Sequence, residues 1–92
     1  MTLAMREPLL TMARSALEQI EPLAAQGWAP AQSIDRQLRW CVAFAGGQPC
    51  PDRPGPFSMG LIATRELDMY GDRPELAELI NQVQQEVERA LA

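Results

Sequence analysis

The chain of 92 residues contains no histidine and no lysine, and it has only two cysteines and one tyrosine. The common general bases, amine nucleophiles and imidazole metal ligands are therefore missing. A glycine-rich loop of the kind that binds phosphate is missing too. We expect no catalytic residues, no cofactor and no bound metal ion, and we predict that the chain is not an enzyme.

Paired carboxylates are the remaining candidates for acid–base chemistry, but their spacing does not favour it. The pairs are Glu18 with Glu21, Glu66 with Asp68, and Glu86 with Glu88. Residues two apart on a helix point in different directions, so the last two pairs cannot share a proton from one helix face. Glu18 and Glu21 could lie side by side, yet they sit opposite the apolar positions and indicate solvated surface.

Long apolar stretches and an excess of basic residues are also lacking. No run approaches the roughly 18 apolar residues that cross a membrane. The chain meets Arg6 and Glu7 near its start instead of continuing as an apolar signal core. The formal net charge of −4 disfavours nucleic acid and mildly favours a basic protein partner. We expect a cytoplasmic protein that binds neither nucleic acid nor membrane.

Each of the two cysteines lies in a different kind of segment. Cys41 stands in an apolar run, which is typical of a small buried hydrophobic residue. Cys50 lies among prolines and glycines, and the sequence leaves open whether it pairs with Cys41.

Apolar residues at three- and four-residue spacing predict four helices. The predicted helices run from about Glu7 to Ala25, from about Ala29 to Ala45, from Ser58 to about Tyr70, and from Asp72 to about Leu91. Four of the eight prolines fall between Gly46 and Phe57, where they exclude a helix. We therefore predict one all-α domain over residues 1–92, a compact bundle of about four helices with a Pro-rich loop between the second and third. A plain connector is the favoured reading of this loop, and a binding role is the alternative.

Several single residues predict how the helices begin, end and pack. Pro8 suits a first helical turn, whereas Pro22 should kink or end the first helix about a turn before Gly27. Ser58 and Asp72 are expected to cap the helices that follow them. Gly60 is costly within a helix, so it suggests that another backbone approaches closely.

Trp40 and Phe44 lie one turn apart on a second, smaller face of the second predicted helix. Packing against a neighbouring helix is the favoured reading. The alternative is a partly exposed contact for a partner protein, or for a second copy of the chain in a homodimer.

The densest group of charges surrounds the junction of the third and fourth helices. Its members are Arg65, Glu66, Asp68, Asp72, Arg73 and Glu75, with Met69 and Tyr70 between them. Helix capping with solvated ion pairs is one interpretation. A polar docking surface is the other, in which Met69 and Tyr70 add apolar contact area among the charges.

Two stretches carry a resemblance to a known family. Gly60-Leu61-Ile62-Ala63-Thr64-Arg65-Glu66-Leu67-Asp68, followed by Pro74-Glu75-Leu76, resembles the hallmark segment of small helical immunity proteins that neutralise a type VI-secreted NAD(P)+ glycohydrolase toxin. Upstream, Gly27-Trp28, Ser33, Asp35-Arg36-Gln37-Leu38 and Trp40 resemble the same family at the same spacing. The resemblance spans about Ala13 to Val83. The chain departs from the family in its expanded loop, Gly46 to Pro56, and in the extra residues Met69 to Gly71.

The resemblance implies an immunity protein that binds a cognate effector toxin tightly and obstructs its active-site cleft. Because toxin modules are exchanged between loci, the partner could instead be another nucleotide-directed effector, such as a (p)ppApp synthetase. We expect the toxin-binding surface to comprise Arg65, Glu66, Asp68, Met69, Tyr70 and Asp72. The alternative from another class is a structural or regulatory helical module that self-associates through Trp40 and Phe44.

Overall fold

The computed structural model describes residues 3–50 and 55–92, which form an all-α bundle. It contains α1 (Leu3–Ala25), α2 (Ala29–Ala45), α3 (Met59–Ala63), the π-helical segment η1 (Thr64–Met69) and α4 (Pro74–Leu91). The predicted all-α class and the four helices are confirmed. Of the prolines in the predicted loop, Pro51 and Pro54 lie outside the described residues.

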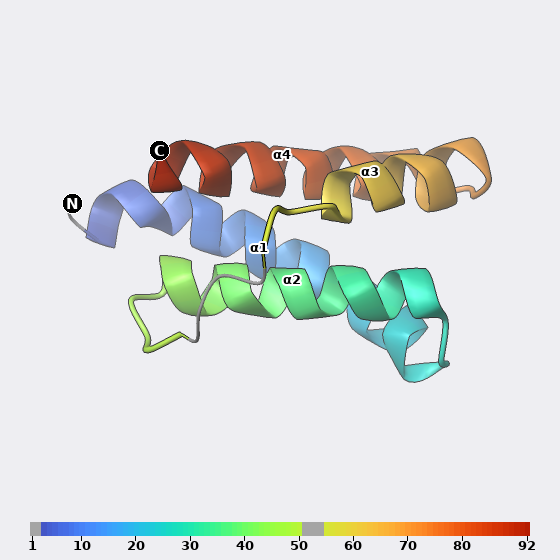
Figure 1. Ribbon diagram of the computed structural model, residues 1–92, viewed down its shortest axis with the longest axis horizontal. Helices are drawn as coiled ribbons and strands as arrows, with labels where there is room; N and C mark the ends of the chain where they lie inside the picture. Colours follow the sequence, from blue (N-terminus) through green and yellow to red (C-terminus); the bar gives the residue numbers. More distant parts are fainter. Residues whose placement is uncertain (1–2, 51–54) are drawn as a thin grey trace.

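The helices form two antiparallel hairpins packed side by side (Figure 1). α1 and α2 make the first hairpin, and α3 continues through η1 into a tight turn before α4 runs back along it. α1 also packs against α4, and α2 against α3, so the described residues fit within 38 × 21 × 21 Å. None of the helices in the described part of the chain combines the length and apolar character that crossing a bilayer requires.

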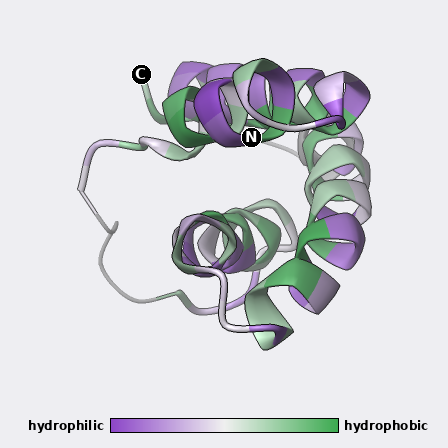
Figure 2. Ribbon diagram, turned by 90° about the vertical axis from the view of Figure 1, so that its right-hand side faces the viewer, coloured by the Kyte–Doolittle hydropathy of each residue, from purple (hydrophilic) through white to green (hydrophobic). Residues whose placement is uncertain are grey.

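The core lies where the apolar faces of the helices meet. Polar and apolar segments alternate along the helices, as the colouring in Figure 2 shows. The largest fully buried apolar side chains are Ile20, Ile34, Leu38, Met59, Ile80, Val83 and Val87. Burying each of these contributes about 1.5–3 kcal/mol, and together they join both hairpins into one domain.

Trp40 belongs to the core. Its ring stacks on Phe44 with centroids 5.2 Å apart and an interplanar angle of 10°, and it lies 5.8 Å from Phe57 in a tilted arrangement. Only 9% of Trp40 is exposed. The favoured reading of core packing is confirmed for Trp40, and Phe57 attaches the end of the loop to α2.

The two cysteines have the environments that the sequence indicates. Cys41 is fully buried among apolar side chains, whereas Cys50 is exposed, and both are free thiols. Burial raises the pKa of the Cys41 thiol from its ordinary value of 9.0 to about 12, because a thiolate there would lose its hydration. The prediction of a buried, hydrophobic Cys41 is confirmed.

The expectation that Pro8 lies in the first turn of α1 is wrong, whereas the predicted end of that helix at Ala25 is confirmed. The helix begins at Leu3, so Pro8 lies beyond the first turn. Pro22 stands inside the helix, which ends at Ala25. A proline disturbs mainly the residues before it, so the chain completes three more helical residues. Gly27, with a φ of +88°, then reverses the chain, and the backbone amide of Gln26 still bonds to the carbonyl of Pro22 at 3.2 Å.

One of the two predicted caps is confirmed and the other is wrong. Ser58 occupies the N-cap position of α3, although its side chain makes no capping hydrogen bond. The backbone N–H of Ser58 is accepted by the side chain of Gln37 of α2, at 2.9 Å. At α4 the residue before the helix is Arg73, not Asp72. The Arg73 N–H bonds to the carbonyl of Leu67 at 2.8 Å, so this backbone contact across the turn determines where α4 begins.

The expectation that a backbone lies against Gly60 is also wrong. A Cβ at Gly60 would lie 2.5 Å from Oδ1 of Asn81 and 3.0 Å from Oε1 of Gln84. The neighbours are thus amide side chains of α4, which need the space that a methyl group would take.

Candidate functional site

The clearest candidate site is an exposed apolar surface on the second hairpin. Among residues 7–50 and 55–92, whose side chains the structure describes, four large apolar side chains are exposed, and three of them fall between positions 61 and 70. They are Leu61 with 72% exposure, Met69 with 68% and Tyr70 with 76%. The fourth, Leu91, lies at the end of α4. Apolar groups gathered in one place are typical of a surface that contacts a partner, whereas scattered ones are not.

The helical spacing of α3 and η1 explains why Leu61 and Met69 face away from the core. Met59, Ala63 and Leu67 are buried at four-residue spacing against the core. Leu61, Arg65 and Met69 repeat at the same spacing, two residues out of step, on the opposite face. We call Leu61, Arg65 and Met69 the helix-three ridge.

The π-helical segment keeps this ridge straight. The N–H of Tyr70 bonds to the carbonyl of Arg65 at 2.9 Å, which spans five residues in place of four. A π-helix turns less per residue than an α-helix, so side chains four apart stay nearly above one another. Both the buried stripe and the ridge therefore continue from α3 through η1.

The structure brings together only some of the residues predicted for the site. Arg65 and Met69 lie on the ridge, and Tyr70 follows it directly. Asp68 is exposed on η1 and Asp72 in the turn that follows it. Glu66 is half-buried, and its Oε2 pairs with the neighbouring Nε of Arg65 at 2.9 Å. Such a surface pair contributes well under about 1 kcal/mol, so it orients the Arg65 side chain more than it stabilises the fold.

Sequence reasoning missed Leu61. It belongs to the apolar run Met59–Ala63, in which an interior position is the ordinary expectation. The signal that could have identified it is its four-residue spacing from Arg65 and Met69, which places it on their face of the helix.

The turn after the ridge leaves no space for a side chain at Gly71. Gly71 is exposed, yet a Cβ there would lie 2.5 Å from the carbonyl oxygen of Glu66 and 2.9 Å from Cα of Leu67. Arg73 reaches from this turn to Gln19 of α1, where its Nη2 donates to Oε1 at 3.1 Å. The end of the ridge is thus attached to both hairpins.

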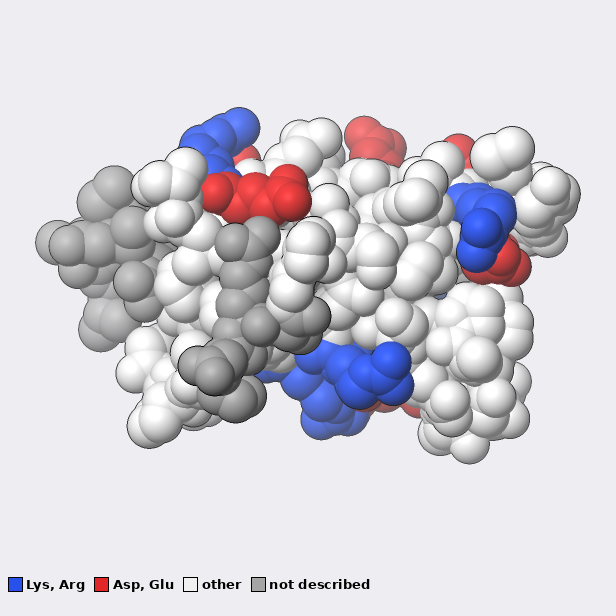
Figure 3. All heavy atoms as spheres, in the orientation of Figure 1, with Lys and Arg blue, Asp and Glu red and all other residues white. Residues whose placement is uncertain are grey.

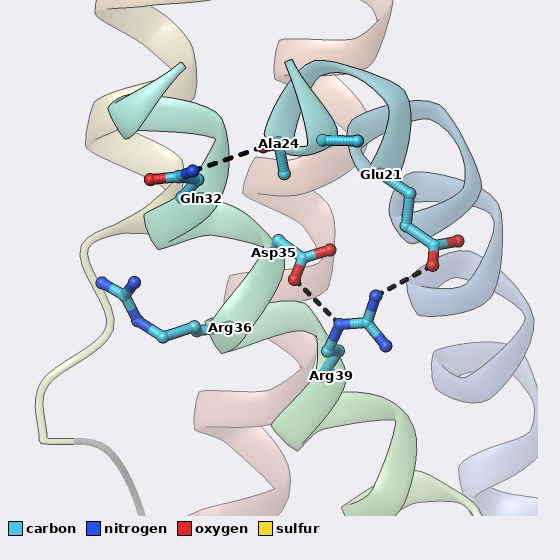
Figure 4. A pocket seen from close by; sticks show the side chains of 7 residues that line it. Glu21, Ala24, Gln32, Asp35, Arg36 and Arg39 are labelled. Carbon is cyan, nitrogen blue, oxygen red and sulfur yellow. Dashed lines mark hydrogen bonds and ion pairs between the residues drawn. The ribbon is translucent and has the colours of Figure 1, made fainter. Parts of the chain in front are cut away.

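A second feature is a shallow hollow of about 420 Å³ between the end of α1 and the first half of α2 (Figure 4). Its lining consists of Glu21, Ala24, Ala25, Gln32, Asp35, Arg36 and Arg39. The guanidinium of Arg39 pairs with Asp35 at 2.8 Å and with Glu21 at 2.9 Å. Hydrogen bonding to Asp35 is the main reason why the pKa of Arg39 lies above its ordinary value. Arg39 thus neutralises the two acids of the lining, although Oδ1 of Asp35 is buried without a hydrogen-bond partner. The hollow has no exposed large apolar side chain and is a weaker candidate than the ridge.

Charged side chains form small separate groups on the surface. On the face shown in Figure 3, acidic and basic side chains lie next to each other in small groups, and uncharged surface separates these groups. Near the ridge, Asp68, Asp72 and Glu75 are exposed acids, while Arg65 is paired and Arg73 reaches toward α1. The surroundings of the ridge are therefore mainly acidic.

Within residues 3–50 and 55–92, no three acidic or thiol side chains gather in a way that could hold a metal ion. Comparison of the chain with protein families, curated proteins and solved structures gives no match. The ridge and its acidic surroundings remain the feature of this chain with the clearest chemistry for binding.

Proposed function

We propose that this chain is an immunity protein that binds a cognate secreted toxin in the cytoplasm and covers its active site. The observation that carries the proposal is the exposure of Leu61, Met69 and Tyr70, three apolar side chains on the short segment that forms the helix-three ridge. Apolar side chains ringed by charges are typical of surfaces that bind another protein. The resemblance of residues 60–68 and 74–76 to type VI immunity proteins supports the same function.

An NAD(P)+ glycohydrolase domain is the toxin that we propose as the partner. A cleft that holds a dinucleotide must accommodate two phosphates, so basic groups are expected at its rim. Asp68, Asp72 and Glu75 would face such groups when the ridge enters the cleft. A (p)ppApp synthetase binds phosphates too, and it is the alternative partner for the same surface.

Self-association through Trp40 is less well supported than toxin binding. The Trp40 ring is packed between Phe44 and Phe57, and exposing it would disrupt the core. A dimer of this kind would therefore require the first hairpin to separate from the end of the loop.

The test is inhibition by the purified protein. We expect a one-to-one complex with the toxin domain encoded beside it, with a Kd of about 1 nM or lower, which is about −12 kcal/mol. Hydrolysis of NAD+ by that domain should stop at equal molar amounts of the two proteins. Light scattering gives the stoichiometry. A stable homodimer that neither binds nor inhibits the toxin domain would exclude the proposal.

A further inference from the structure

The first turn of α3 is held by amide side chains from two other helices. Oε1 of Gln37, on α2, accepts the backbone N–H groups of Ser58 and Met59, each at 2.9 Å. Oε1 of Gln84, on α4, accepts the N–H of Gly60 at 2.8 Å. The first N–H groups of a helix have no partner within it. At α3 these partners come from residues far away in the sequence.

The Nε2 atoms of Gln37 and Gln84 make hydrogen bonds as well. Nε2 of Gln37 donates to the hydroxyl of Ser58 at 3.1 Å and to that of Ser33 at 3.2 Å. Nε2 of Gln84 donates to the carbonyl of Phe57 at 3.2 Å. Gln37 is buried, and a buried amide is costly unless its polar atoms are bonded. Gln37 can therefore lie among core residues because the first residues of α3 satisfy its amide group.

A third amide contacts the point at which α3 becomes η1. Nδ2 of Asn81 lies 3.0 Å from Oγ1 of Thr64, the first residue of η1, and 3.3 Å from the carbonyl oxygen of Gly60. It also lies 2.9 Å from the carbonyl oxygen of Ala77 in its own helix. Asn81 therefore connects α4 to the place where the helix changes its register.

α3 has five residues and η1 has six. Isolated helices shorter than about 12 residues are marginal in water, so this segment needs contacts from outside to keep its arrangement. We infer that Gln37, Asn81 and Gln84 are positioning residues, which fix the start and the register of the helix-three ridge. The inference rests on the proposed function in that the ridge is taken as the toxin-binding surface. A surface held in its bound arrangement loses less conformational entropy on binding and so binds more tightly.

The first measurement needs no partner. Gln84→Met keeps the length of the side chain and removes the acceptor that faces Gly60. The matched control is Gln85→Met, because Gln85 is the exposed neighbour on the same helix. Amide hydrogen exchange followed by NMR should be about tenfold faster at Gly60 in Gln84→Met, and unchanged in the control. Circular dichroism checks that both variants keep their helices.

The second measurement is affinity for the toxin domain. We expect Gln84→Met to raise the Kd about tenfold and Gln85→Met to leave it unchanged. Gln84→Glu keeps an acceptor for the Gly60 N–H but loses the donor to the carbonyl of Phe57 and to Glu88. It should therefore recover part of the protection and part of the affinity that Gln84→Met loses.

Unchanged exchange at Gly60 in Gln84→Met would overturn the inference. Faster exchange with unchanged affinity would overturn it too, because the amide would then hold the helix without affecting binding. If the unaltered chain does not bind the toxin domain, the proposed function fails. The exchange of Gly60 then decides by itself whether Gln84 positions the ridge.

Discussion

Leu61 is the single residue whose exposure most needs a partner to explain it, since 72% of its surface faces solvent on an otherwise well-buried helix. We predict that Leu61→Asp lowers affinity for the toxin domain by about 2 kcal/mol, roughly 30-fold, because it places a charge in the apolar contact. The stability of the free protein should barely change, since the side chain contacts mainly water. Isothermal titration calorimetry and urea denaturation measure the two effects.

The same substitution at Leu91 is the matched control for Leu61→Asp. Leu91 is the exposed leucine at the other end of the second hairpin. Leu91→Asp should bind the toxin domain as the unaltered chain does. Equal losses at both positions would show that any added charge weakens binding, and the ridge would no longer be the contact surface.

Cys41 gives a prediction about pH. Its pKa is raised to about 12 in the folded protein from an ordinary value of 9.0, so the unfolded chain loses this proton first as the pH rises. The stabilising effect of burying the neutral thiol is complete below about pH 9 and is lost progressively up to about pH 12. Over that window the free energy of unfolding should fall by up to about 1.4 kcal/mol per pH unit.

The measurement for Cys41 compares the unaltered chain with Cys41→Ala across that pH window. The variant should be less stable at neutral pH, because it leaves a small cavity. Its stability should fall less steeply between pH 9 and pH 12, and parallel curves for the two proteins would contradict the assignment. Alkylation at pH 8 should label only Cys50 in the folded protein.

At the scale of helices and loops, the sequence is informative where the signals are local. α2 has the bounds predicted for it, Ala29–Ala45, because Pro30 suits a first turn and Gly46-Gly47 suits a helix end. The start of α3 could not be predicted in the same way. Its N–H groups are accepted by Gln37 and Gln84, which lie 21 to 24 residues away in the sequence.

The candidate site is also predictable only where the signals are local. Met69 and Tyr70 follow a charged segment, so their exposure could be expected from the sequence. The four-residue spacing of Leu61 from Arg65 is the local signal for its exposure. The π-helical register of Thr64–Met69, which the hydrogen bond from Tyr70 to Arg65 shows, has no such signal in the sequence.

The turn between η1 and α4 gives a prediction at this scale. Gly71→Ala should lower the free energy of unfolding by about 3 kcal/mol, because the new Cβ would meet the backbone of Glu66 and Leu67 at 2.5–2.9 Å. Gly27→Ala is the control, since Gly27 has a positive φ but nothing within 4 Å of a new Cβ. It should cost only about 1 kcal/mol. Urea denaturation measures both, and equal losses would mean that the turn relaxes around the methyl group.

In the whole molecule, the two hairpins have different roles. The first hairpin supplies the Trp40 cluster and part of the core, and the second carries the exposed ridge. Arg73 and Gln37 connect the second hairpin to the first at the two ends of the α3–η1 segment. The first hairpin thus serves as a support that holds the ridge in place, which is consistent with rigid docking into a cleft.

The net charge of −4 leads to a prediction about the rate of binding. If the toxin cleft is basic, the association rate constant should fall as NaCl is raised from about 20 mM to about 500 mM, because salt screens the attraction. Replacing Asp68 and Asp72 together by asparagine removes two charges beside the ridge. This double variant should associate about threefold more slowly at low salt and depend less on salt, while its dissociation rate barely changes.

The control for this charge effect is the double variant Glu7→Gln with Glu88→Gln, which removes two charges at the opposite end of the bundle, where both termini lie (Figure 1). Both variants have the same net charge, so a difference between them reports where the charges act and not how many there are. Stopped-flow mixing with the toxin domain gives the rate constants. Equal slowing in both variants would mean that the overall charge attracts the toxin and that the acids beside the ridge have no special part. An unchanged rate in both would mean that the partner surface is not basic, and the acidic surroundings of the ridge would then have to face apolar or uncharged groups.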